Sequence, residues 1–387
     1  MSWQKVQLAE VADIERKGVD PSIIEPGTKY LGLEHIESGG KIIGCQNVQN
    51  GELASTKFQF GPHHVLYGKL RPYLGKIALP DFEGICSTDI LPVKPGPSLD
   101  RKFLAYFLRQ PKMVDYASSR STGANLPRLS PKALGTFEIP LPPLDDQKRI
   151  AAILDQADEL RRLRQVAIAK LNTLSHAIFH ELFVKEASEA WPEVQIGDLV
   201  ENARTGPFGS QLLHSEFVEE GIAVLGIDNV VSNDFVWAKP RFITPEKYEQ
   251  LKRYTVRPGD VLITIMGTCG RCAIVPHDIP VAINTKHICC LTPKNKMIRP
   301  EFLKSAFLMH PTVLKQLGIE AKGAVMPGLN MGIIKSLKVP LPPIVAQAKF
   351  AKRLKAIQNA LTAEDRARNK NEILFSSLQQ RAFREEL

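Results

Sequence analysis

One proline-rich segment occurs twice in this chain and constrains its fold more than any other feature. Ile139-Pro140-Leu141-Pro142-Pro143-Leu144 returns as Val339-Pro340-Leu341-Pro342-Pro343-Ile344, and a glutamine follows each copy three residues later, at Gln147 and Gln347. Proline donates no backbone hydrogen bond and its ring clashes with a preceding helical turn, so each segment ends a strand and fixes where the next helix begins. Two such rigid joints predict two-fold pseudo-symmetry.

Other short matches recur in the same order in both halves, as an internal repeat requires. The offset between matched residues grows from 188 through 194 and 195 to 200 along the chain, which small loop insertions produce. The sequence therefore predicts a tandem repeat of one module, with globular domains at residues 1–143 and 187–343 and helical segments at residues 144–186 and 344–387. The matched pairs are Trp3-Gln4-Lys5-Val6-Gln7-Leu8 with Trp191-Pro192-Glu193-Val194-Gln195-Ile196, Leu31-Gly32-Leu33-Glu34-His35-Ile36 with Leu225-Gly226-Ile227-Asp228-Asn229-Val230, Gly75-Lys76-Ile77-Ala78 with Gly270-Arg271-Cys272-Ala273, and Gly123-Ala124 with Gly323-Ala324.

The globular parts have the pattern of mixed α/β (α+β) domains. At 387 residues and 44% hydrophobic content, the chain is long enough for two domains that each bury a core. Short apolar runs such as Val65-Leu66-Tyr67 and Ile90-Leu91-Pro92-Val93 lie between glycines and prolines and predict strands. One amphipathic helix is expected from Arg101 to Gln110, and its twin from Glu301 to Met309.

Each helical segment carries a coiled-coil pattern, because apolar residues recur in alternating strides of four and three. Three charged or polar residues fall on this seam, namely Arg164, Glu364 and Asn371, and we expect them to set how two antiparallel helices pair. The alternative is that they lie at the solvated edge of the pair. The seam runs through Ile153, Ala157, Leu160, Arg164, Ala167, Leu171, Leu174 and Ile178, and through Phe350, Leu354, Ile357, Leu361, Glu364, Arg368, Asn371, Phe375 and Leu378.

Length and charge together suggest a molecular ruler for a polyanion. A helix from Asp146 to Phe183 is about 57 Å long, so two paired helices would form a rod with a globular domain at each end. The net charge of +9 and pI near 9.2 favour nucleic acid, although charge alone is weak support. Two different heads of this kind would touch two different half-sites separated by an unread spacer.

The compartment expected from sequence is the cytoplasm. No run of eighteen apolar residues occurs, and the N-terminal Met1-Ser2-Trp3-Gln4-Lys5 lacks the apolar stretch of a signal peptide. Cysteines in a reducing cytosol stay as thiols, so no disulfide is expected. The six cysteines are Cys45, Cys86, Cys269, Cys272, Cys289 and Cys290.

These residues resemble the DNA-specificity (S) subunits of type I restriction-modification systems, and the likeness covers the whole chain. It rests on the twin proline segments with their helices, on Ser121-Thr122-Gly123-Ala124-Asn125-Leu126-Pro127-Arg128-Leu129-Ser130, and on Arg204-Thr205-Gly206-Pro207-Phe208-Gly209-Ser210-Gln211-Leu212. The resemblance implies two target-recognition domains joined by helices that dock two methylation (M) subunits. Those partners would carry S-adenosylmethionine chemistry on adenine, and two restriction (R) subunits using ATP and Mg²⁺ would complete the complex.

The sequence motifs of methyltransferases, phosphate-binding loops and nucleases are missing or incomplete in this chain, which agrees with a non-catalytic role. The chain has no Asn-Pro-Pro-aromatic tetrapeptide, and Gly68-Lys69-Leu70 lacks the earlier glycine and the Ser or Thr of a phosphate-binding loop. Pro80-Asp81 followed by Asp100-Arg101-Lys102 imitates a nuclease motif, but a metal site needs converging carboxylates and nothing in the sequence requires convergence.

A zinc site is the alternative reading of the cysteines, because two spaced thiolate pairs can form a tetrahedron. The repeat argues against it, since Cys272 aligns with the apolar Ile77 and the adjacent Cys289 and Cys290 would point to opposite faces of a strand. No metal is therefore expected. His63-His64 is expected to lie in a solvated loop.

Candidate DNA contacts are Arg, Lys, polar and aromatic residues in glycine-bearing loops, because glycine lets the backbone approach phosphates and arginine grips guanine. Exposed basic residues are often merely solvated, so each assignment competes with that reading. The first head offers Lys69, Arg71, Tyr73, Arg120, Thr122, Asn125 and Arg128, and the second offers Thr205, Phe208, Ser210, Gln211, Thr268, Arg271, Lys286 and Lys322.

Two rival functions remain open at this point. One is an assembly scaffold that binds proteins and no DNA, and the other is the specificity subunit of a methylase-only system. A DNA reader loses affinity steeply with salt and prefers one sequence, whereas a scaffold does neither.

Overall fold

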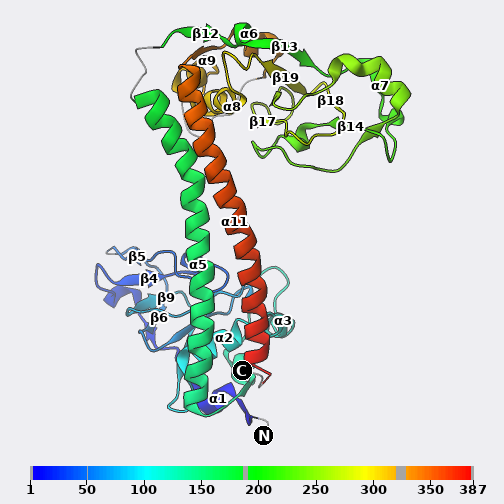
Figure 1. Cartoon of the computed structure of the whole chain (residues 1–387). Helices are drawn as coiled ribbons and strands as arrows, with labels where there is room; N and C mark the ends of the chain where they lie inside the picture. The colour runs from blue at the N-terminus through cyan, green and yellow to red at the C-terminus, as the bar shows by residue number, and fades with distance from the viewer. Residues whose placement is uncertain (1–2, 50, 186–190, 320–327, 385–387) are drawn as a thin grey trace. The chain divides into compact units, whose positions relative to one another are not determined.

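The computed structural model describes residues 3–49, 51–185, 191–319 and 328–384 (Figure 1). The chain divides into two units, one made of Met1–Gln165 with Arg366–Leu387 and the other of Val166–Asp365. Each unit holds one globular head and a part of both long helices. The domain bounds expected from sequence, which treat each helix as its own segment, stay a prediction.

Among the described residues, the first head combines three small sheets with four short helices. Its central antiparallel sheet has the order β2-β10-β7-β8, a second sheet has the order β3-β6-β9-β4-β5, and β1 pairs with β11. The strands are β1 (Lys5–Gln7), β2 (Ala12–Ile14), β3 (Gly18–Val19), β4 (Lys29–Leu31), β5 (Gln46–Asn47), β6 (Lys57–Phe60), β7 (Val65–Gly68), β8 (Ile77–Ala78), β9 (Gly84–Cys86), β10 (Ile90–Pro95) and β11 (Glu138–Pro140). The helices are α1 (Leu8–Val11), α2 (Arg101–Leu108), α3 (Pro111–Ser119) and α4 (Pro131–Gly135).

The second head follows the same plan. Its central sheet has the order β13-β19-β16-β17, its second sheet the order β15-β14-β18, and β12 pairs with β20. The strands are β12 (Glu193–Gln195), β13 (Val200–Thr205), β14 (Ile222–Leu225), β15 (Phe242–Ile243), β16 (Val261–Thr264), β17 (Cys272–Ile274), β18 (Ala282–Asn284), β19 (Ile288–Pro293) and β20 (Lys338–Pro340). The helices are α6 (Ile196–Leu199), α7 (Pro245–Leu251), α8 (Pro300–Met309), α9 (Pro311–Gln316) and α10 (Met331–Ser336).

Strand register confirms the internal repeat residue by residue. Lys5 pairs with Pro140 in the first head, and Glu193 pairs with Pro340 in the second. In the central sheets Tyr67 faces Ile77 as Ile263 faces Cys272. The alignment of Cys272 with an apolar strand position is therefore correct.

A buried glutamine locks each proline segment to its head. The Gln147 side chain is fully buried, donates from Nε2 to the carbonyls of Pro142 (2.8 Å) and Ser98 (2.9 Å), and accepts from the Asp100 N–H at 2.7 Å. Asp100 caps helix α2, so one amide joins the proline segment, the loop and the helix start.

The twin glutamine repeats this arrangement in the second head. Gln347 donates to the carbonyls of Pro342 (2.8 Å) and Met297 (3.1 Å) and accepts from the Arg299 N–H at 2.8 Å. Because buried backbone groups must be paired, both glutamines satisfy loop groups that no regular element reaches.

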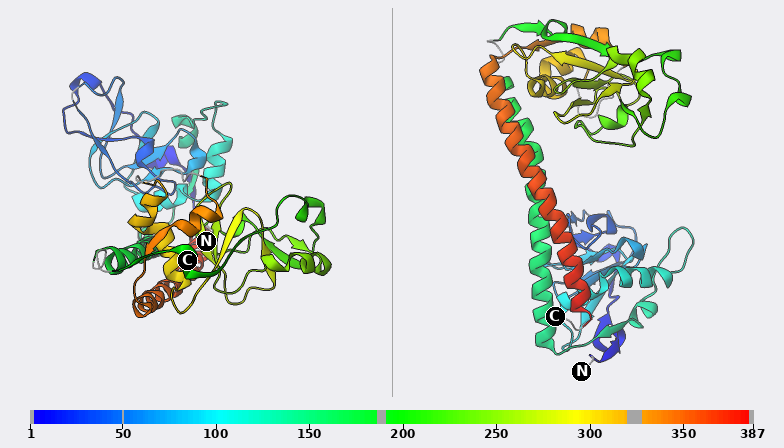
Figure 2. Two further views of the ribbon diagram at one scale, coloured as in Figure 1. Left: turned by 90° about the horizontal axis from the view of Figure 1, so that it is seen from above. Right: turned by 45° about the vertical axis from the view of Figure 1, so that its right-hand side comes forward.

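The two long helices begin directly after the proline segments. Helix α5 (Leu144–His180) continues as a π-helical turn at Glu181–Lys185, and α11 spans Ile344–Ala382. Within each unit the start of one helix lies beside the end of the other, so the pairing is antiparallel (Figures 1 and 2). Ile150 and Leu154 of α5 share a core with Phe383 in the first unit.

Aromatic side chains at the helix ends complete both head cores. Phe183 packs against Phe302 with ring centroids 4.9 Å apart, and Phe383 packs against Phe103 at 5.2 Å. In the second unit Phe350 joins the same cluster, 5.2 Å from Phe183. Each head thus buries the beginning of its own following helix and the end of the other helix.

The helix seam differs in part from the predicted one. Leu160 and Leu174, both expected on the seam, are 48% and 42% exposed. Arg161 takes the contact instead, because its guanidinium bonds Glu372 of α11 at 2.8 Å and lies 4.4 Å from the ring of Phe375. The long aliphatic stem and flat head of arginine let it fill a seam position that apolar counting gives to leucine.

The three buried cysteines of the second head lie in two apolar layers. Cys289 and Cys272 belong to one core cluster, whereas Cys290 belongs to another, as expected for neighbours that point to opposite faces of a strand. Burial raises the pKa of the Cys272 and Cys289 thiols to about 12. Within the described ranges no group of three close metal-ligating side chains includes a cysteine.

Candidate nucleic-acid interface

Backbone pairing brings two predicted DNA-contact loops of the first head together. Lys69 O accepts from the Leu129 N–H at 2.9 Å, and the Arg71 N–H donates to Pro127 O at 2.7 Å. Thr122 and Arg128 exchange two backbone hydrogen bonds of 3.0 and 2.8 Å. The loops at residues 69–74 and 120–129, far apart in sequence, therefore form one surface.

Side chains of this surface stand out from a constrained backbone. Tyr73 is 54% exposed and Leu126 is 45% exposed, while Asn125 between the bridged residues is also exposed. Arg71 adopts a left-handed conformation with φ of 52°, which costs free energy in a residue with a Cβ. Arg120 ends α3 and lies 4.3 Å from the ring of Tyr116.

Arg128, one of the predicted contacts of this surface, forms an ion pair. Its Nε donates to Asp89 Oδ1 at 2.9 Å and its Nη2 to Oδ2 at 3.3 Å. The hydrogen bonds that Arg128 donates to Asp89 raise the pKa of its guanidinium. The pair anchors the 120–129 loop, so a role of Arg128 in base reading would require its guanidinium to leave or share Asp89.

Predicted contact segments of the second head also converge. A Cβ added to Gly206 would meet Asn284 O at 2.0 Å, so the Thr205–Pro207 turn lies directly against the backbone that leads to Lys286. The Ile265 N–H donates to His287 O at 2.8 Å and brings in the loop that carries Thr268 and Arg271, both exposed. Lys322 lies outside the described residues.

The loop after β13 is tied to a tyrosine. Gln211 Oε1 accepts from the Phe208 N–H at 3.3 Å and from the Tyr254 hydroxyl at 2.8 Å. Phe208 is 48% exposed and Ser210 is exposed beside it. The predicted residues of this loop thus share one small, hydrogen-bonded segment.

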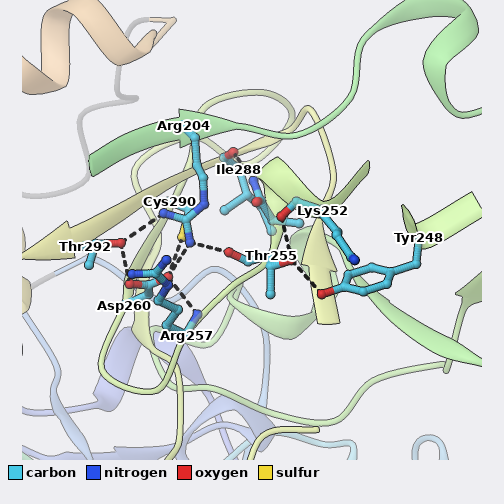
Figure 3. Close-up of polar contacts among 10 residues, drawn as sticks. Arg204, Tyr248, Lys252, Thr255, Arg257, Asp260, Ile288, Cys290 and Thr292 are labelled. Atoms are coloured by element: carbon cyan, nitrogen blue, oxygen red, sulfur yellow. Dashed lines mark hydrogen bonds and ion pairs between the residues drawn. The ribbon is translucent and has the colours of Figure 1, made fainter. Parts of the chain in front are cut away.

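Sequence reasoning missed a buried ion pair behind this loop. Arg204 of β13 donates to Asp260 Oδ2 at 2.6 Å and to Thr292 Oγ1 at 2.9 Å, and both charged side chains are at most 9% exposed (Figure 3). Cys290 donates its S–H to the same carboxylate at 3.2 Å, and burial raises the pKa of that thiol. An arginine at an ordinary strand position gives no sequence signal of a partner 56 residues away.

The first head carries a different polar pair at the corresponding place, and one expectation is corrected there. His64 was expected in a solvated loop, yet it is 3% exposed, accepts the Gly61 N–H on Nδ1 at 2.9 Å and donates from Nε2 to Glu15 at 3.0 Å. That hydrogen bond lowers the pKa of Glu15. Because Nδ1 accepts a hydrogen bond, Nε2 carries the proton. Within the group of Glu15, His63 and His64, Glu15 and His64 are therefore already bonded to each other and are not a ready set of metal ligands.

The fold and these loops define a protein with two related but unequal globular heads, each followed by a long helix. The family described as the type I restriction modification DNA specificity domain matches residues 1–173 and 188–373. The chain belongs to this family. Within the described residues, no helix has the length and apolar character needed to cross a membrane.

Curated relatives carry the same description. The type I restriction enzyme EcoDI specificity subunit of Escherichia coli is 31% identical over 195 residues, which is 49% of this chain and 43% of that protein. The MjaVIII specificity subunit of Methanocaldococcus jannaschii is 26% identical over 308 residues, covering 75% of this chain and 69% of that protein. The match therefore spans less than half of the EcoDI subunit.

Solved structures share the fold at lower identity. The S subunit of a type I restriction-modification system from M. genitalium has a TM-score of 0.60 at 19% identity and covers 98% of this chain and 96% of that one. A chain from a structural study of complex assembly in the type I system has a TM-score of 0.62 at 21% identity, covering 100% and 98%.

Proposed function

We propose that this chain is a DNA-specificity subunit that reads an asymmetric, bipartite duplex site and directs methylation and restriction subunits to it. The observation that carries the proposal is the repetition of one backbone plan with different side chains on its loops. Lys69 and Ile265 both donate their backbone N–H to the next loop, at Asp89 O and His287 O. Equivalent positions thus present a lysine and an aspartate in one head and an isoleucine and a histidine in the other, which suits two unlike half-sites.

Exposed apolar residues on the long helices support partner docking. In the first unit Leu160 and Leu163 of α5 are 48% and 50% exposed, and Ile373 and Leu374 of α11 are 72% and 48% exposed. Apolar side chains gathered on a helix surface are typical of protein interfaces. We assign this surface to the methylation subunits, of which the family resemblance implies two, with two restriction subunits joining them.

The chain itself is proposed to determine which DNA sequence is bound and to catalyse no reaction. S-adenosylmethionine would belong to the methylation subunits, and ATP and Mg²⁺ to the restriction subunits. Such a complex would act on DNA in the cytoplasm.

A scaffold that binds no DNA and a methylase-only system are the competing functions. A scaffold does not explain why the head loops differ while the backbone hydrogen bonds are kept. A methylase-only system shares the same DNA-reading chain and differs only in lacking restriction subunits.

Methylome sequencing tests the proposal directly. Cells that carry this chain and its methylation partner should show methylated adenine at one sequence with two unlike half-sites and a fixed gap. Replacing the second head's loop at residues 205–211 should alter only one half-site. Methylation at a symmetric or continuous site would contradict the bipartite proposal, and unchanged methylation without this chain would favour the scaffold.

A further inference from the structure

A cavity of about 200 Å³ opens beside the buried ion pair of the second head. It lies where β13 passes the turn at Lys252–Tyr254, and four of its six lining side chains are cationic. Figure 3 shows Arg204 of β13 close to Thr255 and Asp260, which follow the Lys252–Tyr254 turn in the chain. The lining residues are Asn202, Arg204, Lys252, Arg253, Thr255 and Arg257.

Carboxylates neutralise only part of this positive charge. Arg204 is paired with Asp260 at 2.6 Å, and Lys252 with Glu249 at 2.5 Å. Arg257 makes no ion pair with any described residue, and its side chain is exposed.

Arg253 donates to a neutral group, the Tyr254 hydroxyl, at 2.6 Å. Two positive charges are thus left without a counter-charge beside a buried arginine whose Nε has no hydrogen-bond acceptor in the described part of the chain. Like charges that line one cavity favour a bound anion.

The first head has the opposite charge at the equivalent position. Asp260 and His64 both accept, through the side chain, the backbone N–H three residues earlier, from Arg257 at 2.8 Å and from Gly61 at 2.9 Å. Arg204 on β13 therefore corresponds to Glu15 beside β2, which bonds His64 as Arg204 bonds Asp260.

Both heads fold with a polar pair here, so the fold does not require an arginine. An acidic residue and a glycine in the first head replace Arg204 and Arg257 of the second. Two of the four cationic residues that line the cavity therefore have no cationic counterpart in the first head.

We propose that this cavity is an anion site that holds a phosphate group, and that its occupant is a backbone phosphodiester of DNA bound by the second head. Arginine and lysine with threonine and asparagine donors suit a tetrahedral oxyanion. Arg253, the Tyr254 hydroxyl and Gln211 form a continuous hydrogen-bonded chain from the cavity to the 208–211 loop. The DNA origin of the phosphate rests on the proposed function, whereas the anion site rests on the cavity itself.

The test uses the full chain with exposed cavity residues changed, namely Lys252→Gln, Arg257→Gln and the double variant. Lys296→Gln, an exposed charge in the same unit away from the cavity, is the matched control. Binding of inorganic phosphate is followed by ³¹P NMR line broadening, and binding of a duplex carrying the methylated site is followed by fluorescence anisotropy over a range of salt concentrations.

The double variant should lose the phosphate-dependent broadening, while the control keeps it. Its DNA affinity should fall about tenfold at moderate salt for specific and scrambled duplex alike, and the slope of log affinity against log salt should decrease by about one or two. Arg257→Lys should restore much of both signals, which a folding defect would not allow.

Other outcomes overturn separate parts. Loss of phosphate binding with unchanged DNA affinity would assign the site to free phosphate and remove the DNA origin. Phosphate binding by a wild-type chain that binds no duplex would sink the proposed function but leave the anion site standing. No phosphate binding and no effect on DNA would overturn the inference entirely.

Discussion

At the level of single residues, buried polar side chains hold each head together where strands and helices meet. Gln147 and Gln347 each satisfy three backbone groups, and His310 occupies a comparable junction in the second head. His310 accepts the Thr312 N–H on Nδ1 at 3.2 Å and donates from Nε2 to Phe183 O at 3.3 Å, so it fastens the end of α5 to the head.

Replacing Gln347 with leucine should lower the free energy of unfolding by about 3 kcal/mol, because an apolar side chain leaves one buried N–H and two buried carbonyls without partners. Gln147→Leu should cost about the same amount, since its hydrogen bonds are the same. Urea unfolding followed by circular dichroism gives both values. Gln358→Leu, on an exposed face of α11, is the control, and a similar loss there would contradict the explanation.

His310 should make the second unit acid-sensitive. Burial lowers the pKa of this imidazole below its usual value, so the unfolded chain takes up the proton more readily than the folded one. Its contribution is therefore fully present above the unfolded pKa of about 6.5 and is lost as pH falls below that value. The hydrogen bond to the Phe183 carbonyl, and after it the Glu193 carboxylate, act in the opposite direction and raise the pKa, but burial is the largest cause.

The variant that tests this comes from the protein's own repeat, because Gln110 occupies the equivalent place before Pro111 and is 4% exposed. Thermal unfolding between pH 7.5 and 5 should show a flatter profile for His310→Gln than for the wild type. Burial also lowers the pKa of His63 and His287, so some acid sensitivity remains in the variant. Parallel profiles would show that His310 does not titrate on unfolding.

At this scale the sequence identified many of the important residues but did not predict the contacts that they make. The glutamines were visible as repeated letters after the proline segments, yet their hydrogen bonds run to loops about 50 residues away. The Arg204 and Asp260 pair and the Glu15 and His64 pair were likewise invisible, because a tertiary contact leaves no periodic trace. Most of the described candidate DNA contacts lie in loops, although Thr205 ends strand β13, and the role of each of them in DNA binding stays a prediction.

At the level of elements, the two long helices are held to each other by aromatic packing more than by charge. Phe350 is fully buried among Phe179 and Phe183, whereas Arg161 and Glu372 are 26% and 40% exposed. Partly exposed ion pairs are screened by solvent, so burial of a phenylalanine ring outweighs them.

Double-mutant and single-mutant energies should separate the two contributions. The coupling energy from Arg161→Ala and Glu372→Ala should be below about 1 kcal/mol. Phe350→Ala should cost about 3 to 5 kcal/mol and should loosen the second unit. Denaturant unfolding measures both, and a coupling energy larger than the Phe350 effect would reverse this ranking.

Helix existence and boundaries were the most predictable part of the fold. The proline segments fix where α5 and α11 begin, and the short helices start at the expected Arg101 and one residue before the expected Glu301. The seam was harder, because apolar spacing placed Leu160 and Leu174 inside. Whether Arg164, Glu364 and Asn371, all partly buried, set the pairing stays a prediction.

At the scale of the whole molecule, α5 begins in the first unit and ends in the second, and α11 runs the opposite way. Seven residues add close to two full helical turns and about 10 Å of length, so an insertion of seven into both helices keeps their facing sides. The gap between half-sites should then grow by about three base pairs. Methylome sequencing of the lengthened protein measures the gap, with insertion into α5 alone as a control that should abolish pairing. A constant gap would contradict the ruler.

The C-terminal ends of the two long helices pack against the heads in the same way. Phe183 closes the second core against Phe302 as Phe383 closes the first against Phe103. In a polypeptide consisting of residues 1–185, the head would lack the end of α11 that packs against it in the full chain. The end of α5 could take that place, but only if it came from a second copy of the polypeptide. Such a half-length protein should sediment as a homodimer. Because its two heads would be identical, it should direct methylation to palindromic sequences, so truncation of the gene would change the DNA specificity in a single step.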